Sequence, residues 1–115
     1  MLAEGQIQGG VVQAMGWALL EEQIYVDGQM RNPNMTNYVV PTFADVPDVR
    51  VLFQESPYAY GPWGAKGIGE LPMDGPAPAI LNAISSALGI DIDALPASPE
   101  RLMRAVLNAQ AQEIR

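Results

Sequence analysis

The residues best suited to chemistry lie in one ten-residue stretch, positions 61–70, with the sequence GPWGAKGIGE. It holds four glycines, a lysine and a glutamate. A backbone so rich in glycine can approach a ligand closely and can adopt φ > 0. Glu70 is the candidate general base, because Ile68 and Leu71 beside it could partly desolvate the carboxylate and make it a stronger base near neutral pH. The alternative interpretation is a glycine-rich turn that ends in an exposed glutamate.

Lys66 has two possible roles in this stretch. Its ammonium could reach a phosphate or a neighbouring carboxylate, or it could be a solvated loop lysine. The stretch differs from the standard phosphate loops, because Lys66 is followed by Gly67 and not by Ser or Thr. The spacing of Gly64, Gly67 and Gly69 also differs from the dinucleotide-binding fingerprint. The sequence therefore argues against a nucleotide cradle of either standard kind.

The composition restricts the remaining chemistry. The chain has no cysteine and no histidine, which removes disulfides, thiol nucleophiles, iron–sulfur ligation and the commonest general base. Asp91 and Asp93 lie close together, but the apolar residues around them do not complete a calcium loop, so we expect no metal site. With 6 basic against 13 acidic residues, the net charge of −7 argues against nucleic acid and anionic membranes as partners.

A helix is predicted over residues 4–24, upstream of the glycine-rich stretch, from its apolar spacing. Each glycine in a helix costs about 0.8–1 kcal/mol relative to alanine, so several in one helix need a reason. Either close helix packing alone, or close approach of another backbone or a cofactor, would supply it. Trp17 and Trp63 are interpreted as packing residues. The glycines of this helix are Gly5, Gly9, Gly10 and Gly16.

The segments that follow the helix predict a small sheet. Residues 24–30 have the composition of a strand ending in an Asp-Gly turn. Residues 38–40 form a short apolar run that is stopped by a proline. Residues 49–55 are β-branched and apolar, which favours a third strand. We therefore expect two or three short strands.

Two helices are predicted after the glycine-rich stretch. The first begins near Asp74 and ends at Gly89, a residue typical of the position just after a helix. The second begins at residues 98–100 (Ser-Pro-Glu), a cap followed by proline at the first helical position. The sequence thus predicts a single α+β domain over residues 1–115: a helix, a short two- to three-stranded sheet, a glycine-rich loop and two C-terminal helices.

No leader or membrane span is recognisable in the sequence. Residues 1–5 contain neither a basic region nor an apolar run, and no stretch of about 18 apolar residues follows. We therefore expect a cytoplasmic protein. Because 49% of the residues are hydrophobic and only 17% are charged, the chain is rather apolar for a small free-standing domain. One explanation is that it packs against more protein.

Several segments together resemble one family, that of xanthine dehydrogenase, aldehyde oxidase and carbon monoxide dehydrogenase. Residues 4–19 (EGQIQGGVVQAMGWAL) are similar to its glycine-rich helix, and residues 37–42 (NYVVPT) to its strand-and-turn element. Residues 64–72 (GAKGIGELP) and 77–83 resemble its active-site glutamate segment. Residues 95–100 are similar to the close of that subunit. These likenesses occur in order over nearly the whole chain.

The resemblance implies the C-terminal part of a molybdenum-cofactor-binding large subunit. Such enzymes hydroxylate an aldehyde or an N-heterocyclic carbon with water. Their cofactor is a molybdenum–pterin, expected here in its cytosine dinucleotide form. The resemblance implies that Glu70 is the active-site base, which takes a proton from the attacking hydroxyl. It also implies that Lys66, Gly67, Ile68 and Gly69 lie against the pterin and the molybdenum ligands.

The family's subunit is several times longer than this chain. The resemblance therefore implies a fragment of a larger molybdopterin-binding domain, which alone binds no cofactor and is inactive. Its partners would be the remainder of the molybdenum subunit and an iron–sulfur subunit, with a flavin subunit as an optional third. The alternative is a non-catalytic assembly module derived from that domain, which self-associates into a homo-oligomer through exposed apolar surface. The substrate cannot be read from these residues.

Overall fold

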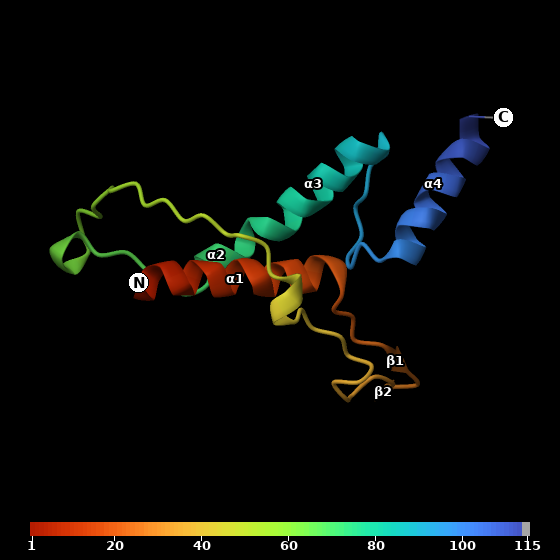
Figure 1. Ribbon diagram of the computed structural model, residues 1–115, viewed down its shortest axis with the longest axis horizontal. Helices are drawn as coiled ribbons and strands as arrows, with labels where there is room; N and C mark the ends of the chain where they lie inside the picture. The colour runs from red at the N-terminus through yellow and green to blue at the C-terminus, as the bar shows by residue number, and fades with distance from the viewer. Residues whose placement is uncertain (114–115) are drawn as a thin grey trace.

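The chain folds around one long helix. The computed structural model describes residues 1–113, which form four α-helices, a two-stranded hairpin and two short 3₁₀ turns. In Figure 1, α1 lies along the long axis, α2 and α3 lie beside it, and α4 stands apart from α1 and α3. The predicted α+β class is confirmed. The elements are α1 (Leu2–Leu19), β1 (Tyr25–Val26), β2 (Gln29–Met30), η1 (Phe43–Asp45), η2 (Pro62–Gly64), α2 (Leu71–Asp74), α3 (Pro76–Leu88) and α4 (Pro99–Glu113).

The helix α1 ends earlier than the predicted helix over residues 4–24. The N–H groups of Leu20 and Glu21 both donate to the carbonyl of Gly16, at 2.8 and 2.9 Å. These bonds satisfy one of the last helical carbonyls while the chain turns away from the helix axis. The predicted end was therefore wrong by several residues, because polar groups beyond the helix bind the backbone of the segment that follows.

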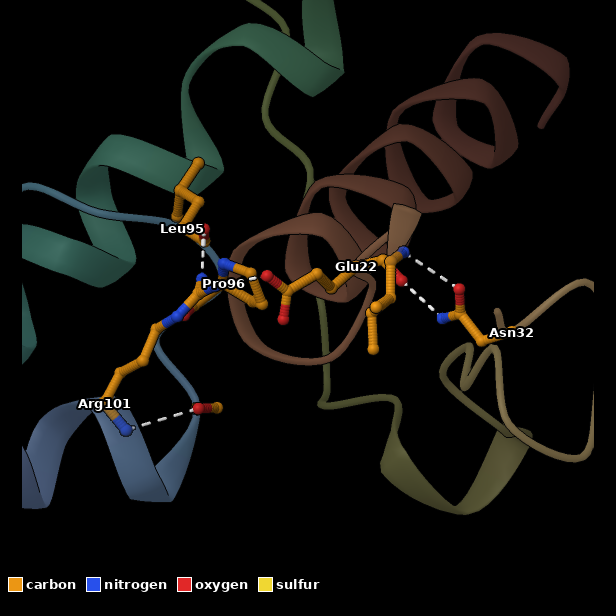
Figure 2. A network of polar contacts seen from close by, with 7 residues as sticks. Glu22, Asn32, Leu95, Pro96 and Arg101 are labelled. Atoms are coloured by element: carbon orange, nitrogen blue, oxygen red, sulfur yellow. Dashed lines mark hydrogen bonds and ion pairs between the residues drawn. The ribbon is translucent and has the colours of Figure 1, made fainter. Parts of the chain in front are cut away.

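Asn32 is the polar residue that captures this segment. It is buried, with 5% of its surface exposed. Its Oδ1 accepts a hydrogen bond from the N–H of Ile24 at 2.9 Å, and its Nδ2 donates to the carbonyl of Glu22 at 2.6 Å (Figure 2). One asparagine amide thus supplies both a donor and an acceptor to backbone that has left the helix.

Arg101, on the first turn of α4, joins the same end of α1. Its guanidinium donates to the carbonyls of Leu95 and Pro96 and pairs with the carboxylate of Glu22 (Figure 2). The bond to Pro96 measures 3.1 Å. A planar guanidinium suits such a cluster, because it offers several N–H donors in a fixed fork. Arg101 therefore ties the start of α4 to the C-terminal end of α1.

Of the three predicted strands, the first is correct in part, because residues 24–30 form both strands of a hairpin around the predicted turn, and the other two are wrong. Strands β1 and β2 pair antiparallel within residues 24–30, and their turn residues Asp27 and Gly28 have φ values of 51° and 74°. Two positive φ values are what a two-residue hairpin turn of this type requires. The predicted strands at 38–40 and 49–55 do not form. Strand propensity reports fit to a neighbouring strand, and the described part of the chain places none beside them.

The helix predictions after the glycine-rich stretch need one correction. They did not include the short helix α2, which begins directly after Glu70, whereas the helix predicted to begin near Asp74 is α3, which begins at Pro76. The ends agree with prediction. Gly89 has φ 69° and donates its N–H to the carbonyl of Ser85, and α4 begins at Pro99 as expected. Within residues 1–113, no helix is long and apolar enough to cross a membrane.

The packed interior of this chain is thin. The buried hydrophobic residues are all alanines, and no large side chain of the described residues is fully buried. The chain exposes 9149 Å², whereas a compact monomer of 12.4 kDa exposes about 6,100 Å². Its radius of gyration of 18.2 Å exceeds the value of about 13 Å typical of compact domains near this size. These residues alone therefore do not close a globular core. The buried hydrophobic residues are Ala14, Ala18, Ala77 and Ala97.

Candidate functional site

The glycine-rich stretch and the glycine-bearing helix meet at one open cavity of about 540 Å³. One wall is the N-terminal half of α1, and the other is the turn that leads from the glycine-rich stretch into α2. The two walls are more than 50 residues apart in the sequence. The lining residues are Gly5, Gln6, Gly9, Gly10 and Gln13 from α1, and Gly69, Glu70, Met73 and Asp74 from the opposite wall.

The glycines of α1 divide into two groups. A Cβ atom at Gly10 would lie 2.5 Å from Cγ of Pro72, and one at Gly16 would lie 2.7 Å from Cδ of Pro41. Glycine is required at these two positions because a proline ring packs directly on the helix backbone. At Gly5 and Gly9 a Cβ would meet nothing within 4 Å. These two glycines therefore leave bare backbone facing the cavity and are not explained by packing within the described residues.

Gln6 connects the two walls of the cavity. Its Nε2 donates to the carbonyl of Gly69 at 2.7 Å, although the two residues are 63 positions apart. This bond holds the peptide immediately before Glu70 against α1. Neither Gln6 nor Gln13 was among the site residues predicted from the sequence. Their seven-residue spacing, with glycines between, was an available signal, because it places them on one face of a helix.

Glu70 stands at the junction of the stretch and α2. It is the residue just before that helix, and its carbonyl accepts a hydrogen bond from the N–H of Met73 at 2.9 Å. Its side chain is exposed, Ile68 is half-buried, and Leu71 is 59% exposed. The expectation that these apolar neighbours desolvate the carboxylate is therefore wrong for the described residues. The backbone positions Glu70, but other groups would have to exclude water from it.

The other predicted cofactor contacts are not all in this cavity. Gly69 lines it beside Glu70, whereas Lys66, Gly67 and Ile68 do not. Lys66 is exposed and lines a separate hollow of about 300 Å³ together with Trp63. Within residues 1–113, Lys66 forms no ion pair. The structure thus brings together Glu70, Gly69 and the α1 glycines, and leaves Lys66 apart.

The donor set of the cavity defines what it can hold. It contains two amides and two carboxylates, those of Glu70 and Asp74, and no lysine or arginine. Amides both donate and accept, and bare glycine backbone allows close approach, so the lining fits a flat heterocycle such as a pterin. Phosphate groups would need cations or helix N-terminal N–H groups from elsewhere. No three His, Cys, Asp or Glu side chains of the described residues are placed to hold a metal ion.

The sequence matches proteins that bind a molybdenum cofactor. The family of the molybdopterin cofactor-binding domain matches residues 1–47. The xanthine dehydrogenase molybdenum-binding subunit of Escherichia coli O157:H7 is 42% identical over 104 residues, which is 89% of this chain and 14% of that subunit. The aldehyde oxidoreductase of Megalodesulfovibrio gigas is 36% identical over 107 residues, covering 92% of this chain and 12% of that protein.

Solved structures give the same result. Quinoline 2-oxidoreductase from Pseudomonas putida 86 superimposes with a TM-score of 0.86 at 40% identity, over 93% of this chain and 14% of that one. Carbon monoxide dehydrogenase from Oligotropha carboxidovorans superimposes with a TM-score of 0.86 at 27% identity, over 97% of this chain and 14% of that one. This chain therefore spans about one seventh of the length of the proteins it matches.

Proposed function

We propose that this chain, which belongs to the xanthine dehydrogenase and aldehyde oxidase family of molybdenum hydroxylases, forms one wall of the cofactor and substrate site of a molybdenum-binding subunit. The observation that carries this proposal is the cavity in which Glu70 faces the glycines of α1. The lining suits a pterin and includes a carboxylate that can exchange protons. The matched relatives are named as a xanthine dehydrogenase molybdenum-binding subunit, an aldehyde oxidoreductase and a quinoline 2-oxidoreductase.

The residues of the cavity would hold the pterin part of the cofactor. Gly5 and Gly9 would let its ring approach the backbone of α1, and Gln6 and Gln13 would bind its polar edges. When bound, the cofactor supplies the redox centre at which a carbon is hydroxylated with oxygen from water. We further propose that it is the cytosine dinucleotide form, whose phosphates lie outside this cavity.

The proposed role of Glu70 is that of general base. Its carboxylate would accept the proton of the attacking hydroxyl group, which makes the oxygen a better nucleophile. The chain contributes position: Gly69 is held by Gln6, and the first turn of α2 follows directly. The chain does not exclude water from the Glu70 carboxylate, since this side chain is exposed. The remainder of the subunit would have to cover Glu70 and exclude water.

Lys66, Gly67 and Ile68 would contact a more distant part of the cofactor. Lys66 is an exposed cation outside the pterin cavity, and an ammonium there can pair with a phosphate. The two residues after it would bring the backbone close to the same ligand, because Gly67 has open space around its Cα. In this proposal, the pterin and the phosphates of the cofactor contact different parts of residues 61–70.

The wider assembly follows from the same reasoning. Residues 1–115 would be part of one larger molybdopterin-binding domain, because their exposed surface is about half as large again as that of a compact monomer. Iron–sulfur and flavin subunits would take the electrons from the molybdenum centre. A second candidate function is a non-catalytic assembly module that self-associates. The observation that favours it is the extent of exposed apolar surface, which includes Phe43 and Leu52.

The test is a chimera in which this chain replaces the matching segment of the Escherichia coli O157:H7 molybdenum-binding subunit. Glu70→Gln should lower hydroxylation of aldehyde or N-heterocyclic substrates by about 10²–10⁴-fold, a loss typical of a removed general base. The molybdenum content should stay unchanged, because glutamine keeps the shape of the side chain. The matched control is Glu100→Gln on α4, outside the cavity, which should leave activity intact.

Two results would contradict these proposals. Full activity of the Glu70→Gln chimera would remove Glu70 as the base. A chimera that assembles but contains no molybdenum, while the native subunit does, would favour the assembly module over the cofactor site.

A further inference from the structure

Residues 57–65 form a closed loop at the end of the molecule opposite α4 (Figure 1). Four backbone hydrogen bonds close it. The N–H of Tyr58 donates to the carbonyl of Gly64 at 3.0 Å, and the N–H of Gly64 donates to that of Gly61 at 2.9 Å. The N–H groups of Gly61 and Ala65 complete the set by donating back to residues 58 and 62. A loop with this many internal bonds holds its own shape.

Two glycines make this closure possible. Gly64 has φ 80°, which a residue with a side chain rarely adopts, and a Cβ there would lie 2.9 Å from Cβ of Pro57. A Cβ at Gly61 would lie 3.2 Å from the ring of Tyr58 and would also collide with the carbonyl of Ala65. Glycine at these two positions therefore lets the two ends of the loop backbone approach each other closely.

The loop presents its aromatic rings outward. The side chain of Trp63 is fully exposed, at 103%, and that of Tyr60 is 88% exposed. Tyr58 packs edge-to-face on Tyr60 with ring centroids 5.7 Å apart. The prediction that Trp63 is a packing residue is thus wrong within this chain, because its ring is covered by none of the described residues.

Trp63 is also held in an unfavourable backbone conformation. Its φ of 52° and ψ of 25° lie in the left-handed region, which is uncommon for residues other than glycine and asparagine. Such strain persists where the surrounding structure imposes it and is concentrated at functional positions. Here the four loop bonds impose it, and the outcome is a tryptophan aimed into solvent. The described residues gain nothing from that placement.

We propose that residues 57–65 are an anchoring loop, and that Trp63 inserts into an apolar pocket on the remainder of the molybdenum-binding subunit. This inference rests on the proposed function, because that function supplies the partner. Tryptophan and tyrosine are the residues most enriched at the energetic centres of protein interfaces. A loop that is already closed loses little freedom when it docks, so most of the contact energy remains as affinity.

Three observations identify the partner as protein, and as the remainder of this subunit. The net charge of −7 disfavours nucleic acid and anionic membranes. The chain exposes about 3,000 Å² more than a compact monomer, a surplus that suits a large permanent interface. The matched subunits are about seven times longer than this chain, so they contain the protein that would cover it.

The test uses the tagged full chain, produced together with the Escherichia coli O157:H7 molybdenum-binding subunit from which the matching segment has been removed. The subunit that copurifies with the tag is the measured quantity. Trp63→Asn removes the ring but keeps a residue that tolerates positive φ, so the loop should stay closed. We expect it to lower copurification by about tenfold or more, as truncation of an interface anchor does. Trp63→Phe should restore most of the binding.

Further variants distinguish a failure of the anchoring loop from a failure of the proposed function. Glu70→Gln should copurify normally, since a proton-transfer role does not require interface contact, and its effect should appear only as lost hydroxylation. Normal copurification of Trp63→Asn would overturn the inference. So would failure of the unaltered chain to bind the subunit, or sedimentation showing that Trp63 drives dimers of the chain alone.

Discussion

The two ends of α1 are built in different ways. The C-terminal end is closed by a polar network in which Asn32 and Arg101 bind backbone carbonyls and the carboxylate of Glu22. No buried side-chain polar atom of the described residues is left without a partner. The N-terminal half is open, and its main polar tie is the exposed bond between Gln6 and the carbonyl of Gly69.

The two ends of α1 therefore differ in what their polar groups do: at one end they fix the chain, and at the other they can bind a ligand. At the closed end, the amide of Asn32 and the guanidinium of Arg101 bind groups of the chain itself, and these bonds fix how the segments after α1 leave the helix. At the open end, glycine backbone and amide side chains face a cavity and keep hydrogen-bonding capacity. The polar network thus fixes the C-terminal end of α1, and the polar groups of the N-terminal half remain available to form a site.

The largest effect is expected where the open half is packed most tightly. Gly10→Val would place a branched side chain against Pro72, where a Cβ alone already approaches Cγ to 2.5 Å. Since the contact is with a proline ring that cannot rotate away, α2 must move from α1. We expect a loss of about 3 kcal/mol in the free energy of unfolding, the upper part of the usual range for overpacking. Urea unfolding followed by far-UV circular dichroism measures it.

A second prediction tests the closed end. Asn32→Ala removes the partner of the Ile24 N–H and the Glu22 carbonyl. Because these bonds are only part-buried, the loss should be about 1 kcal/mol in the free energy of unfolding, the lower part of the range for an unpaired group. The same urea experiment applies, with Asn108→Ala on the exposed face of α4 as the matched control. Equal effects of the two substitutions would mean that the network does not hold the end of α1.

The neighbouring glycine should respond in the opposite direction to Gly10. Gly9→Ala meets nothing within 4 Å, so it should raise the free energy of unfolding by up to about 1 kcal/mol through helix propensity. Its methyl group would enter the cavity, so the molybdenum content of the chimera described above should fall. Metal analysis checks this. A chimera that loads molybdenum normally with Ala at this position would show that the ligand does not approach the helix backbone there.

The smallest effect concerns pH at the closed end. The hydroxyl of Tyr38 donates to the carboxylate of Glu21 at 2.8 Å, and this bond raises the pKa of Tyr38 above its ordinary value of 10.0. A raised pKa means that the contribution to stability is complete below pH 10.0 and is lost as pH rises through the pKa of the folded state. The stability difference between the native chain and Tyr38→Phe should therefore stay constant below pH 10.0 and shrink as pH rises above that value. Tyr60→Phe, on an exposed ring, is the control; a constant difference for Tyr38→Phe would contradict the linkage.

Local signals predicted part of the fold correctly. The Asp27-Gly28 turn, the end of α3 at Gly89 and the start of α4 at Pro99 each depend on a few neighbouring residues. The strands predicted at residues 38–40 and 49–55 could not be decided by neighbouring residues, because a strand exists only with a partner in its ladder. Those segments have the composition of strands and lie in loops.

The candidate site, too, was predicted only in part from the sequence. Residue types alone pointed to Glu70, which ends a glycine-rich stretch, and to glycines that needed a reason because glycine in a helix is unfavourable. The structure alone showed that Gly10 packs on Pro72 while Gly9 faces a cavity, and that Gln6 reaches Gly69 across 63 residues. The reason is physical: caps and turns depend on adjacent backbone, whereas a cavity depends on which distant surfaces come into contact.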